Sequence, residues 1–332
     1  MLRQEEIIIG QWRGGFDSPL ASVCMRTYNL EKYVSQAIES ILNQVTMFPY
    51  EIVIDDDNST DGTQHIIGQY VEKYPRIIKA NFHKKNMGTR RNFVRNLQNA
   101  KGKYIAPCDG DDYWTDILKL QKQVDFLEQN KQYAITYCPL DVLLEDGTIR
   151  KNLYNDRDLE VEQVQKYSLG TGICAACFRN VDIIKDYPVE YHCAPIDDMF
   201  LWPLIGAYGK AKYLPDISPS VYRYHSRGDF QGLSSPQRNK NIYLTFLALS
   251  IYFLRSNNLP LYRHFHKKAI RKSLVLHNRF YYIYNALVFE KNIKALRRMK
   301  KIFKGYIKTE ISQKIKFIDN LRWVRWEYLN KK

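Results

Sequence analysis

The stretch YEIVIDDDNSTDGT, residues 50–63, places a short apolar run, an acidic loop and a glycine in direct succession. The apolar run over Tyr50–Ile54 is typical of a strand that is buried on both faces. The loop Asp55–Gly62 follows it, and apolar residues recur at helical spacing from Thr63 to Tyr74. A strand, a polar loop and a helix in this order predict one half of a βαβ unit.

The same alternation continues on both sides of this stretch. Before it, the pattern predicts a strand over Leu20–Met25 and a helix up to Leu42. After it, the pattern predicts strands over Ile77–Phe82 and Tyr104–Cys108, with a helix over Arg90–Ala100 between them. Strands that alternate with such helices predict an α/β fold with a mostly parallel central sheet flanked by helices.

The pattern beyond Trp114 is mixed. It predicts a helix over 118–129, strands over 133–137, 142–144, 171–178 and 211–214, and helices from Asn241 almost to the end. Three polar loops follow the first, second and fourth strands, at 26–29, 55–62 and 109–112. Because ligands of such sheets bind beyond the carboxyl ends of the strands, these loops predict one site.

Composition limits the class of protein. The chain has 332 residues, of which 45% are hydrophobic and 26% charged, as in ordinary globular proteins rather than disordered ones. Six cysteines are too few for a disulfide scaffold, which favours a reduced, intracellular chain. The amino terminus lacks the pattern of a secretory signal. The longest uncharged apolar stretch, Ile242–Leu254, is too short for a membrane span, so we expect none.

The positive charge is concentrated near the carboxyl terminus. Residues 237–332 hold 23 Lys+Arg against 4 Asp+Glu, whereas residues 1–236 hold 27 against 31. Such asymmetry indicates a basic appendage that meets a polyanion, either nucleic acid or an anionic membrane, or else a solvated basic helical face.

The acidic loops exclude several kinds of site. An EF-hand that starts at Asp57 would need a glutamate where Gly68 stands, and no glycine-rich nucleotide-binding motif occurs. The D-x-D formed by Asp109 and Asp111 suits one hard divalent cation that is shared with substrate phosphates, although a solvated acidic turn would look the same. Cys174 and Cys177 have no second pair at zinc-finger spacing, and alternation along a strand explains them.

Several segments together resemble glycosyltransferase family 2, which has the GT-A fold. They are PLASVCMRTYNLEKYVSQAIESILNQ (19–44), YEIVIDDDNSTDGT (50–63), NMGTRRN (86–92), GKYIAPCDGDDYW (102–114), DDMFLW (197–202), GKAKYL (209–214) and VYRYH (221–225). The resemblance covers about residues 19–226. It implies a sugar transferase of the hexosyltransferase class that uses a nucleotide sugar, with a UDP-sugar as the expected donor.

The resemblance assigns the nucleotide-sugar contacts residue by residue. It implies that the base is contacted by Asp56 or, one residue along, by Asp57. Asp61 either lies near the nucleotide base, or it forms a local turn or a cap for the helix that follows. Arg91 either bonds the phosphates or forms a surface ion pair. The remaining implied contacts are Thr27, Tyr28, Asn29, Asn86, Gly88, Asp109 and Gly110.

The resemblance also assigns the metal ligands and the catalytic base that takes the proton of the acceptor hydroxyl. It implies that Asp111 holds Mn²⁺ or Mg²⁺ against the diphosphate, with Asp109 beside it facing the ribose, and that His225 either reaches the metal or is structural. Asp198 matches the catalytic base, because Leu201-Trp202 and Gly209-Lys210 follow it at the family's spacing. Asp197 takes the neighbouring acidic position. A single in-line displacement would invert the anomeric centre.

These inferences predict four regions: an extension over 1–18, a nucleotide-sugar-binding half over 19–115, an acceptor-binding half over 116–236, and a helical, basic, membrane-associating region over 237–332. From Phe289 to Val324 apolar residues recur in steps of three and four, which is typical of an amphipathic helix on anionic lipid. A helical subdomain packed on the catalytic domain is the alternative reading.

We therefore expect a peripheral enzyme on the cytoplasmic face of a bacterial membrane, where it glycosylates a lipid-linked saccharide in O-antigen or capsule synthesis. We expect no nucleic-acid partner. Two other classes stay open: a nucleic-acid-binding protein that uses the basic tail, and a nucleotide-sugar-binding protein without activity.

Overall fold

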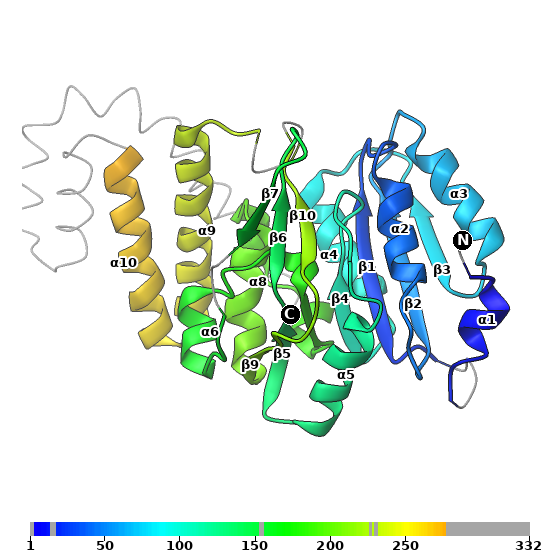
Figure 1. Ribbon diagram of the computed structural model, residues 1–332. Coiled ribbons are helices and arrows are strands. Elements are labelled where there is room, and N and C mark those ends of the chain that lie inside the picture. The colour runs from blue at the N-terminus through cyan, green and yellow to red at the C-terminus, as the bar shows by residue number, and fades with distance from the viewer. Residues whose placement is uncertain (1–2, 14–17, 153–155, 226–227, 229–231, 277–332) are drawn as a thin grey trace, which may run out of the picture.

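The fold is built around a seven-stranded sheet (Figure 1). The computed structural model describes residues 3–13, 18–152, 156–225, 228 and 232–276. The strand order is β3-β2-β1-β4-β8-β5-β9. The bounds are β1 Ala21–Thr27, β2 Tyr50–Asp56, β3 Ile78–Phe82, β4 Tyr104–Pro107, β5 Tyr133–Tyr137, β8 Ala176–Arg179 and β9 Lys210–Tyr213.

Most neighbouring strands are parallel, as the alternating pattern predicts. β1 pairs with β2 in parallel from Ala21↔Tyr50 to Thr27↔Asp56, and it pairs in parallel with β4 on its other side. Only β8 runs antiparallel to both of its neighbours, β4 and β5. The predicted α/β fold with a mostly parallel central sheet is confirmed. Because β1, β2 and β4 point the same way, their polar loops leave the sheet at the same edge.

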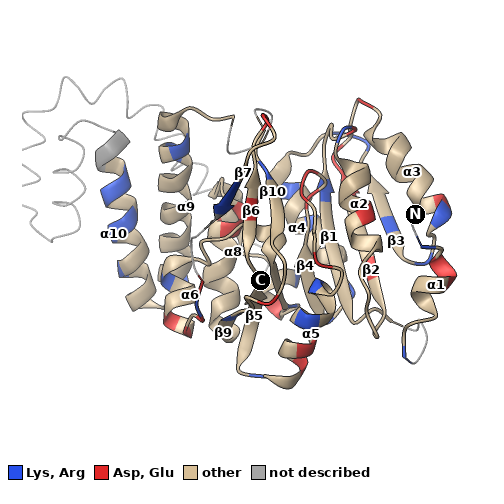
Figure 2. Cartoon of the chain, viewed as in Figure 1, with Lys and Arg blue, Asp and Glu red and all other residues tan. Residues whose placement is uncertain are grey.

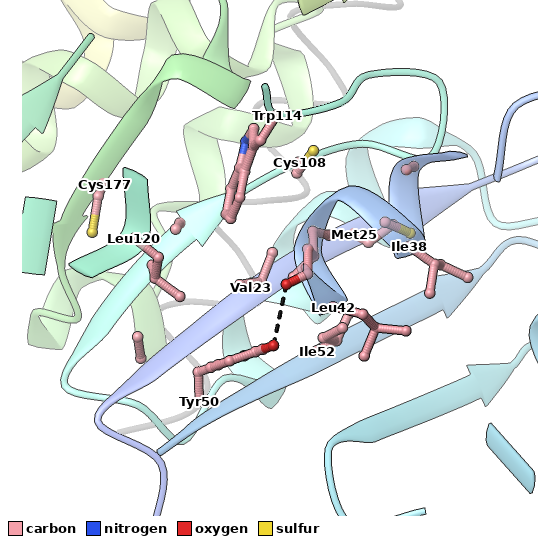
Figure 3. Packing of buried hydrophobic residues seen from close by; sticks show 14 of the residues in the cluster. Val23, Met25, Ile38, Leu42, Tyr50, Ile52, Cys108, Trp114, Leu120 and Cys177 are labelled. Atoms are coloured by element: carbon pink, nitrogen blue, oxygen red, sulfur yellow. Dashed lines mark hydrogen bonds between the residues drawn. The ribbon is translucent and has the colours of Figure 1, made fainter. Parts of the chain in front are cut away.

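Helices cover both faces of the sheet. On one face lie α2 (Val34–Leu42), α3 (Thr63–Lys73) and α5 (Lys119–Gln129), and on the other lie α4 (Thr89–Asn99), α6 (Val161–Tyr167) and α8 (Asp197–Ile205). Buried strand residues alternate between the two cores: Val23 and Met25 face α2, whereas Cys24 faces α4. Tyr50 donates a hydrogen bond to the Ile41 carbonyl, 3.1 Å away, and so fixes α2 on the sheet (Figure 3).

A three-stranded sheet lies beside the central one. Its order is β10-β6-β7, formed by Ser220–Arg223, Leu140–Leu143 and Ile149–Asn152. The predicted strand over 171–178 is only partly right, because residues Ile173–Ala175 form a 3₁₀ turn before β8 begins. Cys174 and Cys177 are both buried in the same core, and both are free thiols.

The ends of the described chain pack on this domain. Helix α1 (Glu5–Ile9) buries Ile8, and Trp12 just beyond it donates to Thr46 Oγ1 at 3.0 Å. Helices α9 (Ser235–Arg255) and α10 (Leu259–Leu276) pack against each other, and α9 contacts α8. Their residues Leu249, Phe253 and Phe265 belong to the same core as Trp202 of α8. The described part of the predicted basic region is therefore a helical pair packed on the α/β domain.

These two helices carry positive charge only. Residues 237–276 contain eight Lys+Arg and no Asp or Glu, and Figure 2 shows blue and no red on α9 and α10. Arg263, Lys267 and Arg271 lie four residues apart on the exposed face of α10. Within the described residues, no helix is long and apolar enough to cross a membrane. The amphipathic pattern over 289–324 lies outside the described residues.

Candidate active site

The three consecutive aspartates at the end of β2 have separate tasks. Asp55 is fully buried and accepts hydrogen bonds from Asn96 and Asn99 of α4. Asp56 accepts from Thr27 Oγ1 at 2.9 Å, and also from Ser59 and Gln64. These contacts join the end of β1 to the end of β2. The loops that follow these two strands are the ones expected to contact the nucleotide base.

Asp57 organises the loop before α4. Its two carboxylate oxygens accept the backbone N–H groups of Met87 and Gly88 at 2.7 and 2.8 Å. Asn86 Oδ1 also accepts from the Gly88 N–H at 3.0 Å. Gly88 has φ +83°, a conformation that L side chains rarely adopt, so the glycine is required by this turn. Arg91 is exposed in the first turn of α4. The structure thus brings Asn86, Gly88 and Asp57 together.

Asp61 bonds the backbone at the start of α3 and across to the loop after β1. Its Oδ1 accepts the backbone N–H of Thr63, the first residue of α3, at 3.0 Å, and Oδ2 accepts the Glu31 N–H at 3.2 Å. Burial acts to raise the pKa of Asp61, but the hydrogen bonds from Thr63 and Glu31 outweigh it and lower that pKa. Asn29, with φ +54°, accepts the Thr60 N–H at 2.8 Å. Tyr28 is 47% exposed beside these contacts.

Gly110 lets the acidic loop after β4 approach β1 closely. Its N–H donates to the Arg26 carbonyl at 3.0 Å, and a Cβ at this position would lie 2.7 Å from Thr27 Cγ2. Any side chain there would push the loop away from β1. This packing role is a structural reason for a glycine that the sequence assigned to the nucleotide sugar.

The two aspartates of the D-x-D have different partners. Asp109 is held by Arg26, whose Nε and Nη2 donate to its two oxygens at 2.9 and 2.5 Å. Asp111 Oδ2 instead lies 3.0 Å from His225 Nε2. Asp112 behind them is buried and accepts the Arg223 N–H at 3.0 Å. Burial and the neighbouring Asp111 raise the pKa of Asp112 well above its usual value.

A carboxylate beside an imidazole is a donor pair that suits Mn²⁺ or Mg²⁺ when substrate phosphates and water complete the shell. Asp111 and His225 fit that requirement, while Asp109 is engaged by the guanidinium. No group of three or more protein ligands for a metal occurs among the residues that the structure describes. A cation here would therefore depend on the substrate for much of its coordination.

The two aspartates at the start of α8, Asp197 and Asp198, also have different partners. Asp197 accepts from Arg26 Nη1 at 2.6 Å and from the Tyr191 hydroxyl. Asp198 accepts the Met199 N–H at 2.7 Å and lines a cavity. Burial, followed by the charge of Asp197, raises the pKa of Asp198 to about 6. A carboxylate with such a pKa is a stronger proton acceptor than an ordinary aspartate and is still ionised near neutral pH.

Arg26 is the residue that the sequence analysis missed. It stands next to the last residue of β1 and joins Asp109 to Asp197, which are 83 and 171 positions away. Its guanidinium carbon lies 4.7 Å from the centre of the Phe93 ring. Position 26 belongs to a predicted site loop, and that placement is the only signal that could have found it.

A cavity of about 900 Å³ brings the acidic residues together. Its volume is within the usual range of small-molecule sites. Residues of the D-x-D, of α8 and of the small sheet line it. The lining includes Arg26, Asp109, Asp111, Asp112, Asp197, Asp198, Leu140, Val142, Leu144, Arg150, Tyr222 and Tyr224. Of the predicted site residues, Asp109, Asp111, Asp197 and Asp198 line this cavity, while the base-contacting candidates on β1 and β2 lie outside its lining.

Comparison with known proteins gives one matching family. Glycosyl transferase family 2 matches residues 22–187. The uncharacterized protein Rv1520 of Mycobacterium tuberculosis is 34% identical over 65% of this chain and 62% of its own length. WfaP of Escherichia coli, named as a UDP-Glc:α-D-GlcNAc-diphosphoundecaprenol β-1,3-glucosyltransferase, is 38% identical over 38% of this chain and 49% of its own. The chain thus spans less than two thirds of these curated relatives.

Solved structures share the fold. TarS 1–349 of S. aureus in complex with UDP-GlcNAc has a TM-score of 0.51 and 19% identity, over 69% of this chain and 66% of TarS. GalNAc-T7 with UDP, GalNAc and Mn²⁺ has a TM-score of 0.51 and 12% identity, over 70% of this chain and 48% of its own. At such low sequence identities the likeness shows a shared fold, that is, the same arrangement of strands and helices.

Proposed function

Since the chain belongs to glycosyltransferase family 2 and is a transferase, we propose that it moves a sugar from a UDP-linked donor to an acceptor hydroxyl with inversion of the anomeric centre. The observation that carries this proposal is that Asp109, Asp111, Asp197 and Asp198 line one cavity. The complexes of TarS and GalNAc-T7 with UDP or UDP-GlcNAc support the choice of nucleotide.

Asp198 is the base of the proposed reaction. It takes the proton from the acceptor hydroxyl while the oxygen attacks the anomeric carbon and the bond to the diphosphate breaks. Its pKa of about 6 suits this task near neutral pH. Asp197 already accepts from Arg26 and Tyr191, so it supports its neighbour and does not take the proton.

The donor side needs compensation for the charge of the leaving diphosphate. We propose Asp111 and His225 as the protein ligands of a Mn²⁺ or Mg²⁺ ion, with Asp109 facing the ribose. When bound, such an ion supplies Lewis-acid stabilisation of the leaving group. The Mn²⁺ in the GalNAc-T7 complex supports a divalent cation in this fold. Thr27, Asp56, Asp57 and the loop at Asn86 hold the nucleotide.

We infer a lipid-linked saccharide as acceptor, in the synthesis of a bacterial surface polysaccharide such as O-antigen or capsule. The name of WfaP, whose substrate is linked to diphosphoundecaprenol, supports this inference. The basic face of α10 supports a place on the anionic cytoplasmic side of a membrane. Residues 237–332 then serve as the membrane-associating region.

Screening the protein against a panel of nucleotide sugars, each with Mn²⁺, Mg²⁺ or chelator, tests this function. We expect UDP release from at least one UDP-sugar, and tighter UDP binding by calorimetry with metal than with chelator. Asp111→Ala should abolish the metal effect, while Asp216→Ala, an exposed aspartate outside the cavity lining, should retain it. Equal UDP affinity with metal and with chelator would remove the cation from the mechanism.

A further inference from the structure

Three residues that are far apart in sequence meet in the lining of the cavity. Arg26 donates two hydrogen bonds to Asp109 and a third to Asp197, with N···O distances of 2.5–2.9 Å. Only 17% of the arginine side chain and 10% of the Asp197 side chain are exposed. We call this arrangement of Arg26, Asp109 and Asp197 the Arg26 bridge.

The Arg26 bridge spans the two sides of the proposed reaction. Asp109 follows β4 on the donor side, and Asp197 begins α8 on the acceptor side. We propose that Arg26 is a positioning residue of the transfer reaction, which joins these two sides and thereby holds Asp198 at a fixed place opposite the donor. This inference rests on the proposed function and assigns to it a residue outside the nucleotide and metal contacts.

The position of Asp198 depends on its neighbour. Asp198 itself accepts the backbone N–H of Met199, a bond that lies within the first turn of α8. Asp197 is the residue that ties this turn to the rest of the site, through Arg26 and the Tyr191 hydroxyl. If Arg26 is lost, Asp197 keeps the Tyr191 hydroxyl, and the Ile196 N–H before the turn keeps its bond to Thr245 Oγ1 at 3.2 Å, but the link from this turn to Asp109 is gone. Asp198 can then move relative to the donor. Small displacements of reacting groups lower turnover strongly.

An arginine suits this position better than a lysine. Its planar group donates in two directions at once, to both oxygens of Asp109 and to one oxygen of Asp197. The Phe93 ring, 4.7 Å from the guanidinium carbon, restrains that plane from one side. A lysine would supply the charge, but its single ammonium group cannot reproduce the three directed bonds.

Arg26 also balances charge around the base. Its positive charge lies near Asp109, Asp197 and Asp198. The phenols of Tyr187 and Tyr222 also interact electrostatically with Asp198. Without the arginine, a negative charge on Asp197 would act on Asp198 without compensation. Proton uptake by Asp198 would then occur at higher pH.

The test compares three variants: Arg26→Met, which keeps an unbranched side chain but removes the guanidinium group, Arg26→Lys, and Arg76→Gln. Arg76 pairs with Glu5 outside the cavity lining and serves as the control for loss of an arginine–carboxylate pair. The probe is UDP release from the UDP-sugar that the unaltered protein turns over best, followed from pH 5 to pH 8. We expect Arg26→Met to lower kcat at least tenfold and to move the acid limb of the profile to higher pH. Arg26→Lys should lose less, and Arg76→Gln should match the unaltered protein.

A double-mutant cycle with Asp197→Asn separates positioning from a general loss of structure. Since both residues act through one bridge, the double variant should lose no more turnover than Arg26→Met alone. The proposal is overturned if the turnover losses of the two single variants multiply in the double variant. It is also overturned if Arg26→Met keeps more than half of normal turnover and its pH profile does not shift. If the unaltered protein turns over no nucleotide sugar, the proposed function is wrong and the positioning role of Arg26 falls with it. The Arg26 bridge itself is disproved if the effects of the two substitutions on thermal unfolding are additive in the same cycle.

Discussion

The base is the residue on which the proposed mechanism depends most. Asp198→Asn keeps the size of the side chain but removes the charged proton acceptor, so we expect turnover to fall about 10²-fold or more. UDP affinity should barely change, because the proton is taken on the acceptor side. Asp197→Asn should lose less, since Asp197 is occupied by Arg26 and Tyr191. UDP-release assays measure the first effect and calorimetry the second. A dead Asp197→Asn beside an active Asp198→Asn would reverse the assignment.

The raised pKa of Asp198 also predicts a pH-dependent stability. Its pKa is about 6 in the folded protein, above the ordinary value near 3.9 that the unfolded chain has. Burial therefore favours the protonated carboxyl in the folded protein. The contribution of this protonated form to the free energy of unfolding is lost as the pH rises through about 6. At pH 7.5 we expect Asp198→Asn to unfold with a free energy larger by up to about 3 kcal/mol.

Chemical unfolding of both proteins at pH 4 and pH 7.5 measures this difference. Most of it should disappear at pH 4, where the carboxyl is largely protonated in the folded state. Asp125→Asn, on the exposed face of α5, is the control and should behave as the unaltered protein at both values. A constant difference between Asp198→Asn and the unaltered protein across this range would show that Asp198 is not perturbed by burial.

At the scale of elements, local pattern predicted most of the donor half. Strands β1, β2 and β4 and helices α2–α4 agree with the expected ranges to within about two residues, because each has a clear apolar period and a polar loop after it. For Asp61 the sequence left open a place near the nucleotide base, a local turn or a helix cap. The observed bond to the Thr63 N–H, two residues on, is a local turn contact, and the N-cap of α3 is Gly62.

The acceptor half was predicted less well because its contacts are not local. Helix α8 reads DDMFLWPLI, which is apolar almost all round beyond the two aspartates and contains a proline, so it has no amphipathic period. Strand β6 pairs with β7 on one side and with β10 on the other, and a long segment of the chain separates β10 from both. The Arg26 bridge depends on side chains 83 and 171 positions apart, and no pattern along the chain reports such a contact.

Helix α10 carries the basic face that is exposed in the described region. Its apolar side packs on α9 through Phe265, whose ring stacks on the Phe253 ring with 5.6 Å between the ring centroids. Arg263, Lys267 and Arg271 are therefore exposed to solvent. We expect serine at these three positions to weaken binding to vesicles that contain anionic lipid, because each cation near such a surface contributes about 1 kcal/mol. Vesicle sedimentation at two salt concentrations measures the loss, which should shrink as salt screens the charge.

The matched control removes three cations elsewhere. Lys73, Lys84 and Lys85 are exposed at or near α3 and β3, and their replacement by serine should leave vesicle binding almost unchanged. If both triple variants bind equally, the net charge matters and not the face of α10. If the unaltered protein prefers nucleic acid to such vesicles at physiological salt, the membrane role is wrong and a polyanion of the other class is its partner.

At the scale of the whole molecule, charge and packing divide the chain at different places. The charge changes sign near residue 237, yet the core does not end there. Leu249 and Phe253 of α9, with Leu261 and Phe265 of α10, complete the core that also contains Phe200 and Trp202 of α8. Arg255 of α9 further donates to Glu190, just before the acidic pair, at 2.6 Å. A cut at the charge boundary would therefore open the core beside the base.

We accordingly predict that two shortened chains behave differently. A chain that ends at residue 276 keeps both helices and should unfold cooperatively, with UDP affinity and donor turnover close to those of the full chain. A chain that ends at residue 235 loses the apolar partners of α8, and each large side chain removed from a core typically costs about 2–5 kcal/mol. It should therefore aggregate or melt far below the longer one. Thermal unfolding followed by circular dichroism separates the two. A chain ending at residue 235 that folds and turns over donor normally would show that α9 and α10 are an appendage to the catalytic domain rather than part of its core.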